Sequence, residues 1–384
     1  MFATHLRCLR CGTIAPLDPR AYLCPRCGPG DDSLDPGIYD VQYDYREAAE
    51  PFLAHIKKPR AQSDIFRFLP LLPVEEPGQV LPTGGTPLVS APRLAGRFGL
   101  KALYLKDETR NPTRSLKDRA TAIALTIAES EGYSDLYCAS AGNAAISLAG
   151  FCAQQGLTCH AFVPHSASAT RLEWLNRYGA NVHVSSGNYD QAFAESEEAG
   201  QENGWYSRNS AYNPYLVEGK KTAAFEIAEQ LDWRAPDLVV SPVGDGCTLA
   251  ALGKGFRELN TLGLTKRLPS LLGIQAEAVQ PIVQRYYGEP VDMEEHETEA
   301  ASIAVRRPRN FLRLRAELDA SGGSLLAVTD EEMHIAQSIL AREAGIVAEL
   351  TSATTFAGLI RLSSIKNLQG QTAVLVITGG RTDD

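Results

Sequence analysis

The sequence has no apolar run near the ~18 residues of a membrane-spanning helix, so we expect no transmembrane segment and no membrane partner. No basic stretch stands out as a footprint for nucleic acid, and the net charge of −9 argues against such binding. No apolar signal core precedes the first cysteines, and there is no internal repeat or low-complexity segment. We therefore expect a cytoplasmic globular protein whose 384 residues form two or three domains.

Four of the eight cysteines lie together near the N-terminus, in the segments CLRCG and CPRCG. Two C-x2-C pairs at this spacing are typical of a tetrahedral structural zinc site, and the glycine after each pair lets the chain turn. So small a segment has no hydrophobic core of its own, and a metal would supply its stability. The alternatives are a ribbon without metal or with a disulfide. The predicted zinc ribbon spans residues 1–45, with the ligands Cys8, Cys11, Cys24 and Cys27.

From Thr86 onward, strand-like and helix-like segments alternate. This pattern predicts an α/β fold with a mainly parallel sheet covered by helices on both faces. Residues 46–79, rich in proline and tyrosine, are expected to form an extended lead-in with one short helix. Ligands of such folds bind where strands end, so the loops there are candidate sites. The expected strands are ALYLKDE, DLYCASAGN, TCHAFVP, NVHVSSG, DLVVSPVGDG, LLGIQAE, SLLAVTD and TAVLVITGG.

The segment NPTRSLKDRATAIALTIAES places a lysine at the start of an expected helix. Ser115 and Asp118 resemble a capping box, so the helix is predicted to begin at Ser115. Lys117 then lies in the first turn, where the helix dipole disfavours a positive charge by up to about 1 kcal/mol. A lysine that loses its proton more readily is a candidate nucleophile or base, and a solvated side chain is the alternative.

Three loops that follow expected strands are polar and rich in glycine. SAGNAAIS opens a helix, and its backbone N–H groups, with Ser140 and Asn143, suit a carboxylate. PVGDGCTLAALGKGF repeats this arrangement and suits a phosphate, to which Thr248 adds a hydroxyl. VITGGRTDD places Thr378 just past a third strand. Each loop alone also fits a simple tight turn.

A reactive lysine, a carboxylate loop, a phosphate loop and a hydroxyl partner are together what pyridoxal phosphate chemistry on an amino acid requires. Over nearly its whole length the chain also resembles the threonine synthase family of fold-type-II pyridoxal phosphate enzymes. Its ribbon resembles the one on archaeal-type threonine synthases and on cysteate synthases. The landmarks, in order, are GGTPL, LYLKDETRNPTRSLKDR, SAGNAAISLA, NPYLVEGKKTAAFEIAEQL, PVGDGCTLAALGKGF and TDEEM.

The resemblance implies a tryptophan synthase beta-like fold, with two open twisted sheets flanked by helices behind the zinc ribbon. A large cofactor-binding domain would combine residues 80–134 with 206–384, and a small α/β domain would span 135–205. The implied cofactors are pyridoxal 5'-phosphate and structural zinc. The implied partners are a small, phosphorylated amino-acid substrate and a second copy of the chain, as a homodimer.

The resemblance also implies roles for single residues. Lys117 matches the lysine that binds the cofactor, and Asn143 matches the asparagine at the cofactor's phenolic oxygen. Thr378 matches the hydroxyl residue that faces the pyridine nitrogen. The residues matched to the cofactor phosphate are Gly244, Asp245, Gly246, Cys247 and Thr248. Those matched to the substrate are Thr113, Arg114, Ser115, Ser140, Ala141, Gly142 and Asn143.

The chain departs from the family pattern in three places. Arg114 and Leu116 replace a glycine and a phenylalanine in NPTGSFKDR, and this arginine either binds a substrate phosphate or points to solvent. Asp245 stands in the phosphate loop, where it must face away or cap the next helix. AELTSATTFAG replaces a Glu-Pro-Ala-Ser-Ala run. The arginine-rich segment 302–315 is interpreted as a charged surface helix, with an anion gate as the alternative.

The function that the resemblance implies is conversion of O-phosphohomoserine and water to threonine and phosphate, with Lys117 moving protons at successive carbons. One alternative is a paralogue that catalyses β-replacement or β-elimination on O-phosphoserine, as in a cysteate synthase-like reaction. A second is a non-catalytic homologue that binds pyridoxal phosphate.

Overall fold

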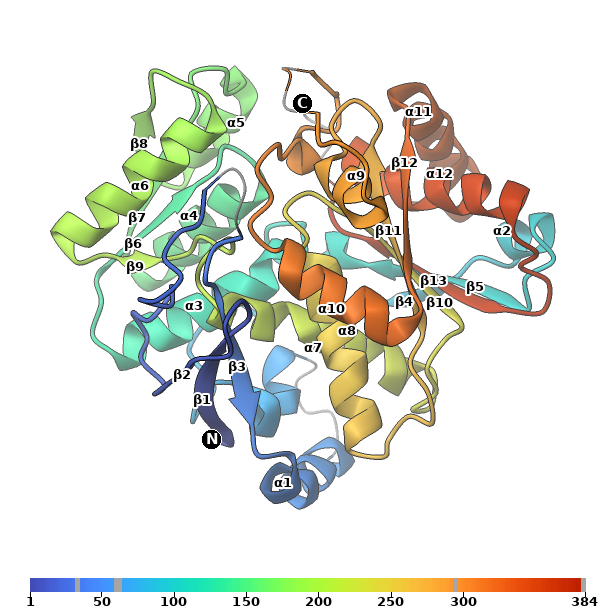
Figure 1. The fold of residues 1–384 in the computed structure, drawn as a ribbon, viewed down its shortest axis with the longest axis horizontal. Coiled ribbons are helices and arrows are strands. Elements are labelled where there is room, and N and C mark those ends of the chain that lie inside the picture. The colour runs from blue at the N-terminus through green and yellow to red at the C-terminus, as the bar shows by residue number, and fades with distance from the viewer. Residues whose placement is uncertain (32–34, 59–63, 293, 295, 381–384) are drawn as a thin grey trace. The chain divides into compact units, whose positions relative to one another are not determined.

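The computed structural model divides the chain into two compact units (Figure 1). Unit 1 contains residues 1–85 and 111–222, and unit 2 contains 86–110 and the described residues from 223 onward. The structure describes residues 1–31, 35–58, 64–292, 294 and 296–380. The expected domain boundaries stay a prediction, and they include residues outside the described ones, namely 32–34, 59–63, 293, 295 and 381–384.

The main sheet of unit 1 has four parallel strands in the order β8-β7-β6-β9. Helix α4 packs against β6 and β7, and so does α6, while α3 packs on α4. Gly156 ends α4 in the left-handed conformation. The strands are β6 (Asp135–Ala139), β7 (Thr158–Val163), β8 (Asn181–Val184) and β9 (Tyr206–Ser207). The helices are α3 (Lys117–Ser130), α4 (Asn143–Gln155), α5 (Ala169–Arg177), α6 (Tyr189–Asn203) and α7 (Tyr215–Gln230).

The sheet of unit 2 has six strands in the order β12-β11-β10-β13-β5-β4. All neighbours are parallel except the edge strand β4, which is antiparallel to β5. Every strand that the sequence predicts is present in one of the two sheets; β4 and β9 were missed, because two or three residues give no periodicity. The strands are β4 (Leu88–Ser90), β5 (Ala102–Asp107), β10 (Leu238–Pro242), β11 (Ser270–Ala276), β12 (Ser324–Val328) and β13 (Thr372–Ile377).

Helices cover both faces of the unit 2 sheet. Leu271 and Ile274 are three residues apart on β11, so their side chains point to opposite faces. A Cβ on Gly253 of α8 would touch Leu271 at 2.9 Å, whereas a Cβ on Gly358 of α12 would touch Ile274 at 2.1 Å. The helices are α2 (Pro92–Arg97), α8 (Cys247–Thr261), α9 (Pro281–Tyr287), α10 (Phe311–Ser321), α11 (Asp330–Ile339) and α12 (Leu350–Ile365).

The N-terminal ribbon is a three-stranded antiparallel sheet in the order β2-β1-β3, formed by Ile14–Ala15, Ala3–Cys8 and Tyr39–Tyr43. The lead-in that follows is more helical than expected. It contains α1 (Tyr45–Lys57) and the 3-10 helix η1 (Ile65–Leu71). The tyrosines and prolines suggested extended chain, but the Asp44 carboxylate accepts from two N–H groups at the start of α1 and caps this helix.

Tyr43 of β3 joins a buried ion pair on α7. The Lys221 Nζ lies 2.5 Å from the Glu218 carboxylate and 4.0 Å from the centre of the Tyr43 ring. The Tyr43 hydroxyl donates to the same carboxylate at 2.8 Å. A buried ion pair is costly unless its remaining polar groups are satisfied. The ribbon therefore completes the environment of two charges in the interior of unit 1.

Gly219 of α7 gives a test of close helix packing in unit 1. A Cβ there would lie 2.0 Å from the Arg119 carbonyl oxygen of α3. We predict that Gly219→Ala lowers the free energy of unfolding by about 2–3 kcal/mol, because backbone atoms cannot move aside cheaply. The control is Gly96→Ala on exposed α2, where a Cβ meets nothing and the change is expected to raise stability slightly. Equal effects in denaturant unfolding would contradict this packing.

Candidate active site

Helix α3 begins at Lys117, two residues later than predicted, and the predicted capping box does not form. The Ser115 hydroxyl accepts from the Lys117 N–H at 3.3 Å. The Asp118 carboxylate instead accepts from the Thr113 N–H at 2.7 Å and from the Thr113 hydroxyl. The prediction was wrong because this carboxylate turns toward Thr113, before Ser115. Lys117 is nevertheless the first residue of the helix, where the dipole acts on its charge.

Asp118 is fully buried under this first turn. Burial raises the pKa of its carboxyl group, while hydrogen bonds from Ser147 and Thr113 and the charge of Arg208 act in the opposite direction. The helix N-terminus also favours a negative charge at this position. The residue after the candidate lysine is thus held by groups from three parts of unit 1.

Arg114 lies in the turn that precedes Lys117. Its N–H donates to the Asn111 carbonyl at 2.8 Å, and the Asn111 side chain accepts from the Gly84 N–H at 2.9 Å. The φ of Arg114 is 65°, in the left-handed region that favours glycine. Its side chain is exposed. This chain therefore carries an arginine in a backbone conformation that favours glycine.

The loop that follows β6 leads directly into α4. The Ser140 N–H donates to the Phe162 carbonyl at 2.9 Å, and the Ser140 hydroxyl accepts from the Gly142 N–H at 3.1 Å. Ala141 is buried and Asn143 is the first residue of α4. The N-cap Gly142 provides no side-chain cap, and a helix N-terminus favours an anion. The assignment of this loop to a carboxylate stays a prediction.

The loop between β10 and α8 has the same design in unit 2. Gly246 is the N-cap of α8 with a φ of 95°, and as a glycine it provides no side-chain cap. A Cβ on Gly244 would lie 3.1 Å from the Ile303 Cα, so only glycine fits without a shift. Cys247 and Thr248 begin α8, the former buried and the latter half-buried. A helix N-terminus favours a phosphate, and the assignment of one to this loop stays a prediction.

Asp245 binds the segment that precedes α10. Its carboxylate accepts from the Arg309 N–H at 2.6 Å and from the Asn310 side-chain amide. The electrostatic difficulty of an aspartate in a phosphate loop is thereby resolved, because this charge binds the segment before α10.

The interpretation of residues 302–315 as one surface helix was wrong. The chain forms a 3-10 helix over Ala301–Ile303 and becomes helical again only at Phe311. Asp245 binds the backbone N–H of Arg309 outside any helix, and Pro308 has no N–H to give. Arg313 is buried and donates to the Asn310 side chain at 3.2 Å.

Thr378 follows β13, the strand between β10 and β5. Its hydroxyl lies 3.1 Å from the Ser352 hydroxyl of α12, which also accepts from the Gly379 N–H at 2.8 Å. Because β10 and β13 are parallel neighbours, Thr378 and the 244–246 loop lie at the same edge of the sheet. The end of the VITGGRTDD loop, residues 381–384, lies outside the described residues.

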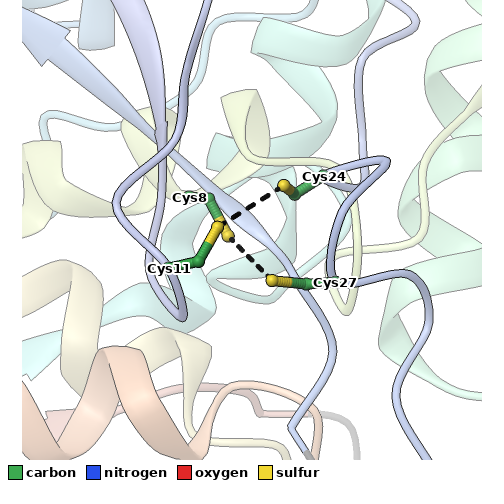
Figure 2. A group of neighbouring side chains, drawn as sticks. All are labelled: Cys8, Cys11, Cys24 and Cys27. Carbon is green, nitrogen blue, oxygen red and sulfur yellow. Dashed lines mark hydrogen bonds between the residues drawn. The ribbon is translucent and has the colours of Figure 1, made fainter.

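The four N-terminal cysteines point toward one another (Figure 2). Their sulfur atoms all lie within 4.8 Å of each other, with Cys8–Cys27 at 4.0 Å and Cys11–Cys24 at 3.8 Å. A tetrahedral zinc with Zn–S bonds of about 2.3 Å requires sulfurs about 3.8 Å apart. All four thiols are free, so the disulfide alternative does not describe this structure. The hydrogen bond with Thr13 lowers the pKa of Cys11 to about 6.

Sequence reasoning missed several residues that hold these loops. A Cβ on Gly37 would lie 2.4 Å from the Cys27 Cβ, so the cysteine cluster needs glycine there. Asn209 accepts from the Ala139 N–H at 2.7 Å and fixes the end of β6. Arg208 and Ser352 support Lys117 and Thr378 in the same way. The polar run SRNS starts at the last residue of β9, and it gave no usable signal because so short a strand could not be recognised in the sequence.

Comparison with known proteins assigns the family. Residues 80–379 match the family described as pyridoxal-phosphate dependent enzyme. The threonine synthase of Methanocaldococcus jannaschii is 36% identical over 380 residues, which cover 97% of this chain and 91% of that protein. The threonine synthase of Methanosarcina acetivorans is 37% identical over 381 residues, covering 98% and 91%. The chain belongs to the threonine synthase family of pyridoxal phosphate-dependent enzymes.

Solved structures agree on the fold. Threonine deaminase isoform 2 of Solanum lycopersicum superposes with a TM-score of 0.69 at 18% identity, covering 94% of this chain and 93% of that one. Maize serine racemase gives a TM-score of 0.68 at 17% identity, covering 88% and 93%. These likenesses confirm the predicted fold-type-II architecture. Within the described ranges, the structure contains no helix long and apolar enough to cross a membrane.

The residues present fit the family's cofactor. Lys117 starts a helix in unit 1, and in unit 2 α8 follows a loop in which Gly244 leaves no room for a Cβ and Gly246 has a φ of 95°. The chain is therefore a pyridoxal phosphate-dependent lyase of the threonine synthase type.

Proposed function

We propose that this protein converts O-phosphohomoserine and water to threonine and inorganic phosphate. The observation that carries the proposal is the identity of 36–37% with two archaeal threonine synthases over nearly the whole chain, ribbon included. The lysine at the start of α3 supports it, because the reaction needs an amine that gains and loses protons near neutral pH. A homodimer in the cytoplasm is part of the same proposal.

Pyridoxal phosphate, when bound, supplies an electron sink: it delocalises the electron pair that stays on carbon when a proton leaves. In our proposal Lys117 binds it covalently, and its amine then removes and returns protons at successive carbons of the substrate. Asn143 and Thr378 contact the cofactor ring, and the N–H groups of residues 244–248 bind its phosphate, with the Thr248 hydroxyl. Three loop residues, Ser140, Ala141 and Gly142, bind the substrate carboxylate together with Asn143. The turn before α3 contributes Arg114 and Ser115 to the substrate phosphate, whereas Thr113 uses its N–H and hydroxyl on Asp118 and supports the turn.

The deciding experiment supplies O-phosphohomoserine and O-phosphoserine separately to the purified enzyme. We expect equal amounts of phosphate and threonine from the first compound and none from the second. Lys117→Ala should reduce kcat by at least about 10³-fold and abolish the visible absorbance of lysine-bound cofactor, because no other group can replace the amine. Lys366→Ala, an exposed lysine at the end of α12, is the control and should keep both.

Other outcomes of this experiment would reject the proposal. Phosphate with a keto acid from O-phosphoserine alone would establish β-elimination. Sulfur-dependent replacement of that phosphate would establish a cysteate synthase-like reaction. If the cofactor absorbance is retained and neither compound is turned over, the protein binds the cofactor without catalysing a reaction on either compound.

Arg114 gives a second test, because its strained backbone persists beside the proposed substrate site. Releasing a left-handed conformation with glycine should raise the free energy of unfolding by about 1 kcal/mol in Arg114→Gly. If the arginine binds the substrate phosphate, the same variant should raise KM for O-phosphohomoserine at least about tenfold. The matched control is Asp232→Gly, an exposed residue with a φ of 55°, which should gain similar stability and keep KM. An unchanged KM in Arg114→Gly would place the arginine in solvent.

We further propose that the four cysteines bind one structural zinc. Metal analysis should find one zinc per chain in the wild type, and Cys11→Ser should lose it, because three thiolates retain zinc far more weakly than four. Cys11 is exposed, so its replacement leaves no cavity that would confuse the result. Buried Cys159→Ala is the control and should keep the metal. Zinc-free and zinc-loaded protein with the same unfolding temperature would contradict a structural role.

A further inference from the structure

Arg208, which follows β9, is a buried cation under the first turn of α3. Its exposed fraction is 2%. Its Nη2 donates to the Lys117 carbonyl at 3.0 Å, and its Nε donates to the Thr121 hydroxyl at 3.1 Å. The Thr121 hydroxyl in turn donates to the Lys117 carbonyl at 3.1 Å. The backbone of the lysine therefore receives two hydrogen bonds besides those of the helix itself.

Several contacts within unit 1 fix the position of Arg208. Its N–H donates to the Tyr137 carbonyl of β6 at 2.8 Å, and its Nη1 donates to the Ser210 hydroxyl at 3.1 Å. The preceding Ser207 N–H donates to the Tyr22 hydroxyl of the ribbon at 3.2 Å. Its charge also acts on the carboxyl group of Asp118, as described above. The backbone at Arg208 is thus held from β6 and from the ribbon, and its guanidinium is held by Ser210 and by α3.

We propose that Arg208 is a positioning residue for Lys117. It binds the backbone carbonyl of the lysine and so fixes the direction in which the lysine side chain projects from the helix. The first turn of a helix is where its backbone is least constrained, and the direction of Cβ follows from that backbone. A misplacement of about 1 Å between reacting groups is enough to cost about 10²-fold in rate. This inference rests on the role of Lys117 in the proposed function.

A matched pair of variants separates positioning from simple structural support. Thr121→Val and Ser210→Ala each remove one hydroxyl that accepts from the Arg208 guanidinium. Only Thr121 also donates to the Lys117 carbonyl. We expect Thr121→Val to lower kcat for O-phosphohomoserine about tenfold with KM changed less than about twofold. Ser210→Ala should keep both constants within about twofold of the wild type.

Two variants of Arg208 itself complete the test. Arg208→Gln removes the charge and the donor fork, while Arg208→Lys keeps the charge and one donor. We expect kcat to fall most in Arg208→Gln and to recover in part in Arg208→Lys, per molecule of folded, cofactor-loaded enzyme. Should Arg208→Gln fail to fold, the isosteric Thr121→Val still decides the question.

Hydrogen exchange gives a readout that does not depend on turnover. The backbone amide of residue 121 faces the Lys117 carbonyl across the first turn. Its hydrogen-exchange rate should therefore rise in Thr121→Val and in Arg208→Lys, and it should stay at the wild-type value in Ser210→Ala. Wild-type kcat and exchange in Thr121→Val, or equal losses in Thr121→Val and Ser210→Ala, would overturn the proposal. If the wild type makes no threonine, the proposed function fails while the exchange rates still decide whether Arg208 holds Lys117.

Discussion

A carboxylate without access to water must be surrounded by donors, and Asp118 imposes this requirement on the start of α3. Thr113 satisfies it from the preceding turn, Ser147 from α4, and the charge of Arg208 from the segment after β9. The groups that stabilise Asp118 therefore also gather the elements around Lys117. The position of Lys117 therefore depends on the hydrogen bonds that Asp118 requires as well as on the contacts of Lys117 itself.

The sheets could be predicted because each buried parallel strand appears in the sequence as an apolar run that ends in polar residues. The segments DLVVSPVGDG and TAVLVITGG each contain an apolar strand pattern followed by a glycine-rich loop pattern. In the structure the two strands are parallel neighbours. The cysteine cluster could be predicted as well, because two short C-x2-C turns bring the thiols of each pair together locally. In each case the information lies within a few residues of the feature.

What the sequence could not reveal is which of several possible partners a polar side chain takes in the fold. Ser115 and Asp118 have the spacing of a capping box, and only the fold shows that the carboxylate turns to Thr113 instead. Asp245 looked unsuitable beside a phosphate until its partner Asn310 was known, 65 positions away. The same holds for Arg208, which is 91 positions from the carbonyl it binds. Helix and strand propensities describe single residues, so they give no information about such pairs.

The ring of Tyr43 over Lys221 bears on how this enzyme can be shortened. Metal ribbons often look like appendages that a protein engineer would remove to obtain a smaller catalyst. Here a chain cut after the ribbon would leave a lysine and a glutamate of α7 without the hydroxyl and the aromatic face that now cover them. Such a cut would have to be accompanied by apolar replacements for both charged residues. The ribbon and α7 would therefore have to be redesigned together.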